Sequence, residues 1–226
     1  MLCFSKILFK DEYQRDVSVL NLAILISGRG SNMESILSAV LANKITNVKP
    51  CVVISNNPDA SGLKVASEKF EIPVEVAKGN GAQGWQYDQR IFALLRQYGV
   101  TAEAGLVCLA GFMRVISPEF IRHYKMRIMN IHPALLPSFP GLHAQRQALK
   151  YGVKISGCTV HFVDEGIDSG PIILQRVVTV RDSDTEESLS SRILEQEHIL
   201  YPESVKLFAE GKIAVVGRRV FIHERT

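Results

Sequence analysis

The chain has 226 residues, of which 46% are hydrophobic and 22% are charged, with a formal net charge of +3. This length suits a single α/β domain with a sizeable core, and the composition is ordinary for a globular enzyme. The small charge does not support nucleic-acid binding, and no apolar run approaches the roughly 20 residues of a membrane helix.

The four cysteines, Cys3, Cys51, Cys108 and Cys158, are far apart and form no metal-binding motif. This pattern predicts reduced thiols in a cytoplasmic protein. Residues 1–18 begin with an apolar stretch that lysines interrupt, and no small-residue cleavage site follows. We therefore expect them to be a disordered extension, and residues 19–226 to form one domain.

Short apolar runs and amphipathic segments alternate in the first part of the chain. The runs predict strands over residues 20–26, 49–55, 73–77, 104–110 and 126–131. The segments between them predict helices over residues 31–43, 60–70, 85–99 and 117–124. Continuous apolar strands separated by helices indicate a Rossmann-like α/β fold, in which helices flank both faces of an open, mostly parallel sheet.

The pattern changes after residue 155. Residues 156–163 and 170–180 read as two strands that we expect to be antiparallel. A long helix is predicted from Ser183, where SDTE matches a capping box, and it should be kinked or ended at Pro202. Residues 212–222 read as a hairpin.

The first candidate site is SGRGSN, residues 27–32, between the first predicted strand and helix. Glycines let backbone N–H groups approach an anion, and a helix N-terminus adds partial positive charge. The segment departs from a dinucleotide fingerprint, because Met33 replaces the third glycine and Ser55, not an acidic residue, ends the second strand. We expect a lone phosphate with Ser31 and Asn32 as donors; a plain turn and NAD binding are the alternatives.

The second candidate is LAGFMRVISP, residues 109–118, which follows the fourth predicted strand. Open α/β sheets place ligands beyond the carboxyl ends of their strands. Four apolar side chains there could form a slot for a flat ring: Phe112, Met113, Val115 and Ile116. The alternative is a loop whose apolar residues cover the core.

The third candidate is NIHPALLPSFPG, residues 130–141. Asn130 and His132 are two residues apart, so on a strand they project to the same side, and Pro133 keeps His132 out of a helix. An imidazole beside a carboxamide can donate to an oxyanion and transfer a proton. A structural histidine is the alternative.

The fourth candidate is HFVDEGIDSGPI, residues 161–172, which holds three carboxylates without matching cations: Asp164, Glu165 and Asp168. A carboxylate that accepts from His132 would favour the charged imidazole, and Asp168 is our choice for it. His161 lies mid-strand, where we expect a supporting or structural role. The histidines and carboxylates give no clear ligand triad, so we expect no metal.

The fifth candidate is Glu197, which falls near the apolar stripe of the last long helix. A carboxylate is costly there unless it is paired. An amine-bearing substrate and an internal salt bridge are both possible partners.

Taken in order, LISGRGSN, LAGFMR, NIHPALLPSFPGLH, HFVDEGIDSGPI and EQEH closely resemble the folate-dependent formyltransferases, and among them the phosphoribosylglycinamide formyltransferases of purine synthesis. The resemblance covers roughly residues 20–222. It implies transfer of a formyl group from 10-formyltetrahydrofolate, without a metal, to the amine of 5′-phosphoribosylglycinamide. The N-terminal half would serve the nucleotide and the C-terminal half the folate.

The resemblance also implies roles for individual residues. The catalytic trio would be Asn130, His132 and Asp168. The ribonucleotide would contact Gly30, Ser31, Asn32 and Glu197. The folate would contact Met113, Arg114, Val115, Ile116, Asp164, Glu165, Gly166 and Ile167.

One position departs from the family pattern. Many relatives carry an arginine just before the Tyr-Asp pair, where it can meet the folate glutamate tail, and Gly84 stands nearest to that position here. Arg90 or Arg114 would have to replace part of that charge. The alternatives are a formyltetrahydrofolate hydrolase, another formyltransferase or a non-catalytic nucleotide-binding module, and the protein is expected to be a monomer or a homodimer.

Overall fold

The computed structural model describes residues 19–223, so the extension predicted over residues 1–18 lies outside the described part. A seven-stranded sheet has the order β3-β2-β1-β4-β5-β6-β7. Its strands are β1 (Leu20–Ile26), β2 (Val48–Ser55), β3 (Val74–Val76), β4 (Gly105–Leu109), β5 (Ile128–His132), β6 (Ile155–Phe162) and β7 (Ile172–Thr179). β1 to β5 are parallel, while β6 and β7 are antiparallel to their neighbours. The predicted α/β fold with an antiparallel C-terminal part is confirmed.

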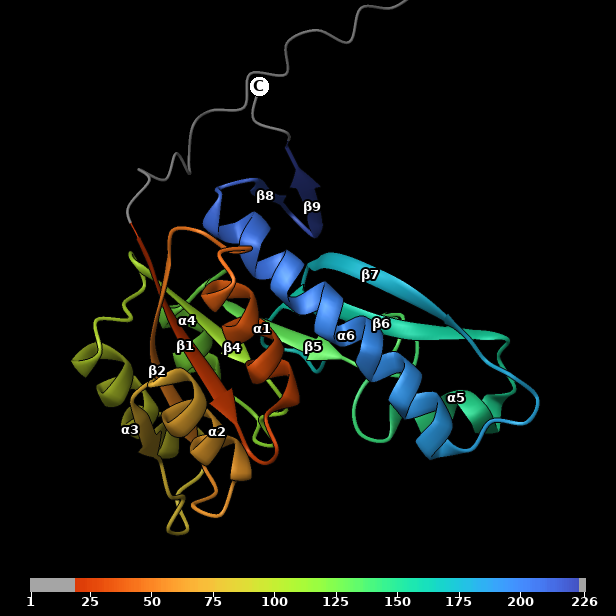
Figure 1. Ribbon diagram of the computed structural model, residues 1–226, viewed down its shortest axis with the longest axis horizontal. Helices are drawn as coiled ribbons and strands as arrows, with labels where there is room; N and C mark the ends of the chain where they lie inside the picture. The colour runs from red at the N-terminus through yellow and green to blue at the C-terminus, as the bar shows by residue number, and fades with distance from the viewer. Residues whose placement is uncertain (1–18, 224–226) are drawn as a thin grey trace, which may run out of the picture.

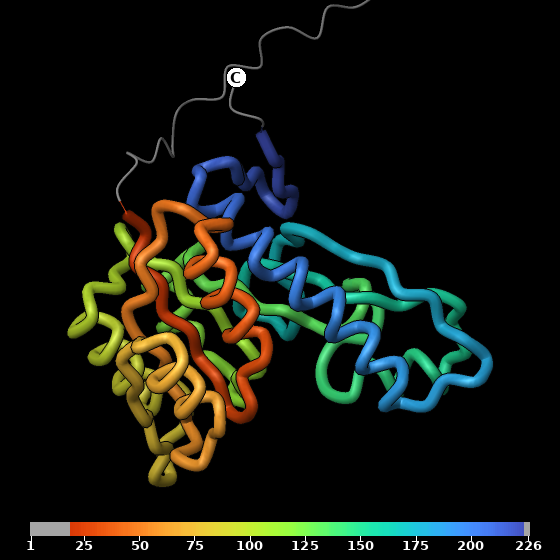
Figure 2. The backbone as a smooth tube through the Cα atoms, in the orientation of Figure 1, coloured from red at the N-terminus to blue at the C-terminus, as the bar shows by residue number. Residues whose placement is uncertain are grey.

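Six helices surround this sheet in the described residues (Figure 1). They are α1 (Ser31–Leu41), α2 (Ser61–Phe70), α3 (Gly84–Gln97), α4 (Pro118–His123), α5 (Ala144–Tyr151) and α6 (Glu186–Ala209). The sequence reading missed α5, a helix of two turns. Figure 2 shows the chain between β5 and α6, in cyan, extending away from the N-terminal part of the sheet.

The two sheet faces bury alternate residues of the same strand. In β1, Leu22, Ile24 and Ile26 pack in one core cluster with residues of α1, α2 and α6. Ala23 and Leu25 pack in the other with residues of α3 and α4. Because successive strand side chains point to opposite faces, an apolar strand with no polar alternation needs a helix layer on each face.

Helix α6 differs from its prediction at both ends. Its N-cap is Thr185, whose capping box pairs with Ser188, so the predicted box beginning at Ser183 is wrong. The helix does not end at Pro202 but continues to Ala209. The residues around this proline are buried against the sheet, among them Tyr201 and Val205, and this packing offsets the backbone hydrogen bond that proline cannot make.

The predicted C-terminal hairpin is confirmed as β8 (Ile213–Val216) and β9 (Arg219–Ile222), which pair separately from the main sheet. Gly217 lies in its turn with φ 60°. No helix within residues 19–223 has the length and apolar character that crossing a membrane requires.

Candidate active site

Three candidate segments meet at one edge of the sheet. β4 lies between β1 and β5, and these strands are parallel, so their carboxyl ends share that edge. The strand order reverses between β1 and β4, and such a switch point is where open α/β sheets bind ligands. A hydrogen bond of 2.7 Å from the backbone N–H of Met113 to Ser27 Oγ joins the first two segments.

The N-terminus of α1 is open to an anion. Gly30 is its N-cap with φ 71°, a left-handed conformation that glycine adopts without strain, and no side chain caps the helix. The first N–H groups of the helix therefore have no side-chain acceptor. This arrangement fits the phosphate site expected at Gly30 and Ser31.

Asn32 and Glu197 are already paired with each other. The Asn32 amide Nδ2 donates to Glu197 Oε2 at 2.7 Å, and both residues are buried. Burial raises the pKa of the Glu197 carboxyl, although the Asn32 hydrogen bond opposes this. The partner of Glu197 inside the protein is thus an amide and not the cation of an internal salt bridge, and the Asn32 side chain is directed at Glu197.

His132 lies between two acceptors at the end of β5. Its Nδ1 is 3.1 Å from Asp168 Oδ2, and its Nε2 is 2.8 Å from the carbonyl oxygen of Phe139. A doubly protonated ring satisfies both contacts, because each ring nitrogen then donates. The side chain is only 5% exposed. The expected partnership of His132 with Asp168 is present.

Asp168 collects donors from three other residues, two on β5 and one in the loop that follows it. Its Oδ2 also accepts from the backbone N–H of Gly141 at 2.8 Å, while Oδ1 lies 3.5 Å from Asn130 Nδ2. Asn130 and His132 therefore reach the same carboxylate, which their position on the same side of β5 allows. The 3.5 Å contact is longer than an ordinary hydrogen bond, so the Asn130 amide is held loosely by Asp168.

His161, in its neutral form, contacts the Asn130 amide beside Asp168. Burial lowers the pKa of His161, and its Nδ1 lies 2.9 Å from the carbonyl oxygen of Phe162. With the proton on Nδ1, Nε2 accepts from Asn130 Nδ2 at 3.3 Å. The 3.7 Å separation between His161 Nε2 and Asp168 Oδ1 is then not an ion pair.

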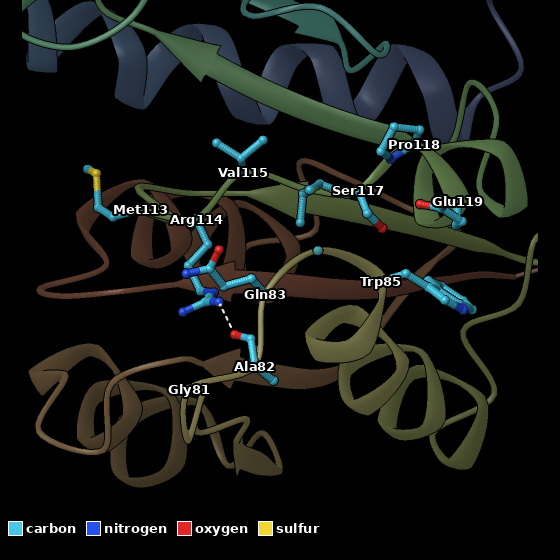
Figure 3. A pocket seen from close by; sticks show the side chains of 12 residues that line it. Gly81, Ala82, Gln83, Trp85, Met113, Arg114, Val115, Ser117, Pro118 and Glu119 are labelled. Atoms are coloured by element: carbon cyan, nitrogen blue, oxygen red, sulfur yellow. Dashed lines mark hydrogen bonds between the residues drawn. The ribbon is translucent and has the colours of Figure 1, made fainter.

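A cavity of about 650 Å³ lies beside this edge, lined by residues 81–85 and 113–119 (Figure 3). Arg114 reaches from the segment after β4 toward Ala82, whose carbonyl oxygen accepts at 2.9 Å. Its guanidinium also lies 3.8 Å from the ring centroid of Tyr87. Gly84, the departure from the family pattern, lines the cavity, whereas Arg90 does not and instead donates to the carbonyl of Lys78.

The four expected folate contacts at residues 113–116 line this cavity, but residues 164–167 do not. Met113 and Val115 are highly exposed there, and Ile116 is buried. Glu165 is paired with Arg122 of α4 at 3.0 Å, so the expectation that it lacks a matching cation is wrong. The partner lies 43 residues away in the chain, where local sequence does not reveal it.

Some groups at the site escape sequence reading. The Phe139 carbonyl and the Gly141 N–H belong to the backbone, so no side chain marks them. The buried Tyr201 hydroxyl lies 3.1 Å from the carbonyl of Leu109, the last residue of β4, and 2.9 Å from that of Met129, near the start of β5. Within residues 19–223 no group of three metal-ligating side chains occurs.

Comparison with known proteins gives the class of this molecule. A family model described as formyl transferase matches residues 20–205. The chain belongs to the formyl transferase family.

Within this family, the chain is similar to enzymes that carry one particular description. It is 40% identical to phosphoribosylglycinamide formyltransferase of Escherichia coli strain K12, over 86% of this chain and 89% of that enzyme. A solved structure of glycinamide ribonucleotide transformylase 1 from Symbiobacterium toebii has 43% identity and a TM-score of 0.86, covering 95% of this chain and 99% of that one. The chain is also 42% identical to a trifunctional purine biosynthetic protein of Drosophila melanogaster, of which it spans 14%.

Proposed function

We propose that this protein transfers the formyl group of 10-formyltetrahydrofolate to the primary amine of 5′-phosphoribosylglycinamide, in de novo purine biosynthesis. The observation that carries this proposal is the contact of His132 and Asn130 with one carboxylate, that of Asp168, at the strand edge beside an uncapped helix N-terminus. The similarity to phosphoribosylglycinamide formyltransferase supports the choice of substrates.

The ribonucleotide would bind at the N-terminus of α1. Its phosphate would accept from the backbone N–H groups after Gly30 and from the Ser31 hydroxyl. Glu197, buried and held by Asn32, would accept from polar hydrogens of the nucleotide. The pterin would lie against residues 113–116, with the loop around residues 164–167 as its second wall.

The substrate amine would attack the formyl carbon, forming a C–N bond and a tetrahedral oxyanion. In the structure, the Phe139 carbonyl oxygen is the acceptor for His132 Nε2. In the reaction, the oxyanion would replace that carbonyl oxygen as the acceptor. Asn130 would turn the hydrogen that points weakly at Asp168 toward the same oxyanion. Each such donor commonly contributes about 3–4 kcal/mol to a transition state.

The intermediate would collapse by breaking the bond between the formyl carbon and N10 of the folate. One proton must leave the attacking amine and one must reach the departing nitrogen. Asp168 would keep His132 oriented and charged, and would help a water molecule carry that proton. No covalent bond to the protein is needed.

A spectrophotometric assay tests the proposal by following deformylation of 10-formyltetrahydrofolate with and without 5′-phosphoribosylglycinamide. We expect turnover only with the amine present, and one formylated product per folate consumed. Release of formate without the amine would instead indicate a hydrolase. Absence of both reactions, with tight NAD binding in a calorimeter, would indicate a nucleotide-binding module.

We also propose that residues 19–226 act as one domain in the cytoplasm, as a monomer or a homodimer. The three described cysteines, Cys51, Cys108 and Cys158, are free and buried, which supports a reducing compartment. Burial raises the pKa of the Cys108 thiol and of the Cys158 thiol to about 12, so neither is a reactive thiolate at neutral pH.

A further inference from the structure

The β8–β9 hairpin lies beyond residues 20–205, which the family model matches. It is nevertheless anchored to the body of the protein, because Ile213, Val215 and Val220 pack against the core cluster that includes α6. β9 also contacts β7, the strand that follows the loop of Asp168. The hairpin turn is therefore held at a defined position near that loop.

Arg218 in this turn makes a direct contact with the loop. Its Nη2 donates to the carbonyl oxygen of Ser169 at 2.5 Å. Ser169 is the residue after Asp168, so this bond fixes the Ser169–Gly170 peptide group, one residue beyond the proposed catalytic carboxylate.

The backbone at Asp168 needs such support. Its φ is 48°, a left-handed conformation that costs free energy for a residue with a Cβ atom and persists only where surrounding contacts impose it. Nearby, Ser169 Oγ donates to Asp164 Oδ1 at 2.5 Å, and this bond closes the loop on itself. The Arg218 contact ties the closed loop to a separate, anchored element.

We propose that Arg218 is a positioning residue for the formyl transfer, which keeps Asp168 at hydrogen-bond distance from His132 by holding the Ser169 carbonyl. The inference rests on the proposed function and adds a part of the chain outside the matched family region. Asp168 Oδ2 is 3.1 Å from His132 Nδ1, so a displacement of the loop by about 1 Å would remove that bond.

The first experiment compares Arg218→Ala with a matched control, Arg219→Ala. Arg219 is the neighbouring arginine, and its guanidinium lies over the Phe221 ring at 4.9 Å. We expect Arg218→Ala to lower kcat about five- to tenfold with little change in either KM, since one hydrogen bond in the catalytic support is lost. Arg219→Ala should match the wild type, and Arg218→Lys, which keeps a donor, should recover part of the loss.

The second experiment separates positioning from general stability. If Arg218 acts through Asp168, then Arg218→Ala should change kcat less than about twofold in an Asp168→Asn background, because coupled residues are not additive. The residual rates are measurable by counting radiolabelled formyl product. Denaturant midpoints of all variants are recorded beside the rates.

The outcomes distinguish the two proposals. A wild-type protein without formyl transfer would overturn the proposed function itself. An active wild type in which Arg218→Ala equals Arg219→Ala, or in which Arg218→Ala costs the same factor with and without Asp168→Asn, would overturn the positioning role of Arg218.

Discussion

The proposed catalytic trio and the segment proposed to contact folate lie at the same sheet edge but are built differently. The side chain of His132 is 5% exposed and that of Asp168 is 15% exposed, and each has its partners within the protein. Met113 and Val115, in contrast, are 71% and 83% exposed. His132 and Asp168, which are proposed to handle charge, are held by partners within the protein, whereas the residues proposed to contact folate are left open.

This difference follows from what each region must do. Donors that stabilise a developing oxyanion contribute most when they need little reorganisation, and buried contacts hold His132 and Asp168 against each other. Apolar surface stabilises a complex only if it becomes buried on binding, so it must be exposed beforehand. Changes in the trio should therefore affect kcat, and changes in the open segment should affect KM.

The largest effect is expected from His132→Ala. It removes the main oxyanion donor and leaves Asp168 without its buried partner, so kcat should fall about 10²- to 10³-fold while both substrates still bind. Steady-state kinetics and calorimetry with each substrate check this. A rise in KM with nearly normal kcat would show that His132 serves substrate binding. His132 would then not differ in role from the proposed folate segment.

Glu197→Gln should mainly weaken ribonucleotide binding. The amide keeps an acceptor for Asn32 but loses the charge, and we expect KM for 5′-phosphoribosylglycinamide to rise about tenfold with kcat little changed. The raised pKa of Glu197 means that its charged form destabilises the fold, and that this cost appears as pH rises through that pKa.

Urea denaturation provides the matched stability measurement for that variant. Glu197→Gln should be at least as stable as the wild type at neutral pH, and the difference should shrink as the pH falls and the native carboxyl becomes neutral. A variant that is clearly less stable at neutral pH would show that the Glu197 charge is satisfied within the protein.

Arg114→Ala should raise the KM for the folate substrate by about fivefold and leave kcat nearly unchanged, because a single cation at a partly exposed site contributes modestly. Lys64→Ala on α2 is a suitable control, since its side chain is 75% exposed and lies outside the described cavity. Equal KM values of the two variants for the folate substrate would show that Arg114 does not contribute to folate binding.

The smallest effect concerns acid stability through His161. Burial lowers the pKa of His161 in the folded state. As the pH falls, this histidine is therefore protonated in the unfolded chain before it is protonated in the folded protein. The free energy of unfolding then decreases as the pH falls below the ordinary histidine pKa of about 6.5. His161→Gln, which cannot be protonated, should lose less stability between pH 7 and pH 5. If the wild type and the variant had the same urea midpoint as each other at pH 7 and again at pH 5, this would contradict a neutral, buried His161.

The sequence was sufficient where side chains and strand periodicity carry the information. Asn130 and His132 share one side of β5 because strand side chains alternate, and Asp168 was the correct partner. It was insufficient where backbone or distant partners decide the geometry, as with the Phe139 carbonyl and the Arg122 partner of Glu165. The continuation of α6 beyond Pro202 likewise depends on tertiary packing, which outweighs local propensity.

The most direct test of the account is turnover and binding of Asp168→Asn, measured on the same preparation. The amide keeps the shape of the carboxylate but cannot stabilise a charged His132, so we expect kcat to fall about 10²- to 10⁴-fold, with calorimetric dissociation constants for both substrates within about threefold of the wild type. Near-normal turnover, or loss of binding equal to the loss of rate, would contradict a preorganised catalytic pair of His132 and Asp168.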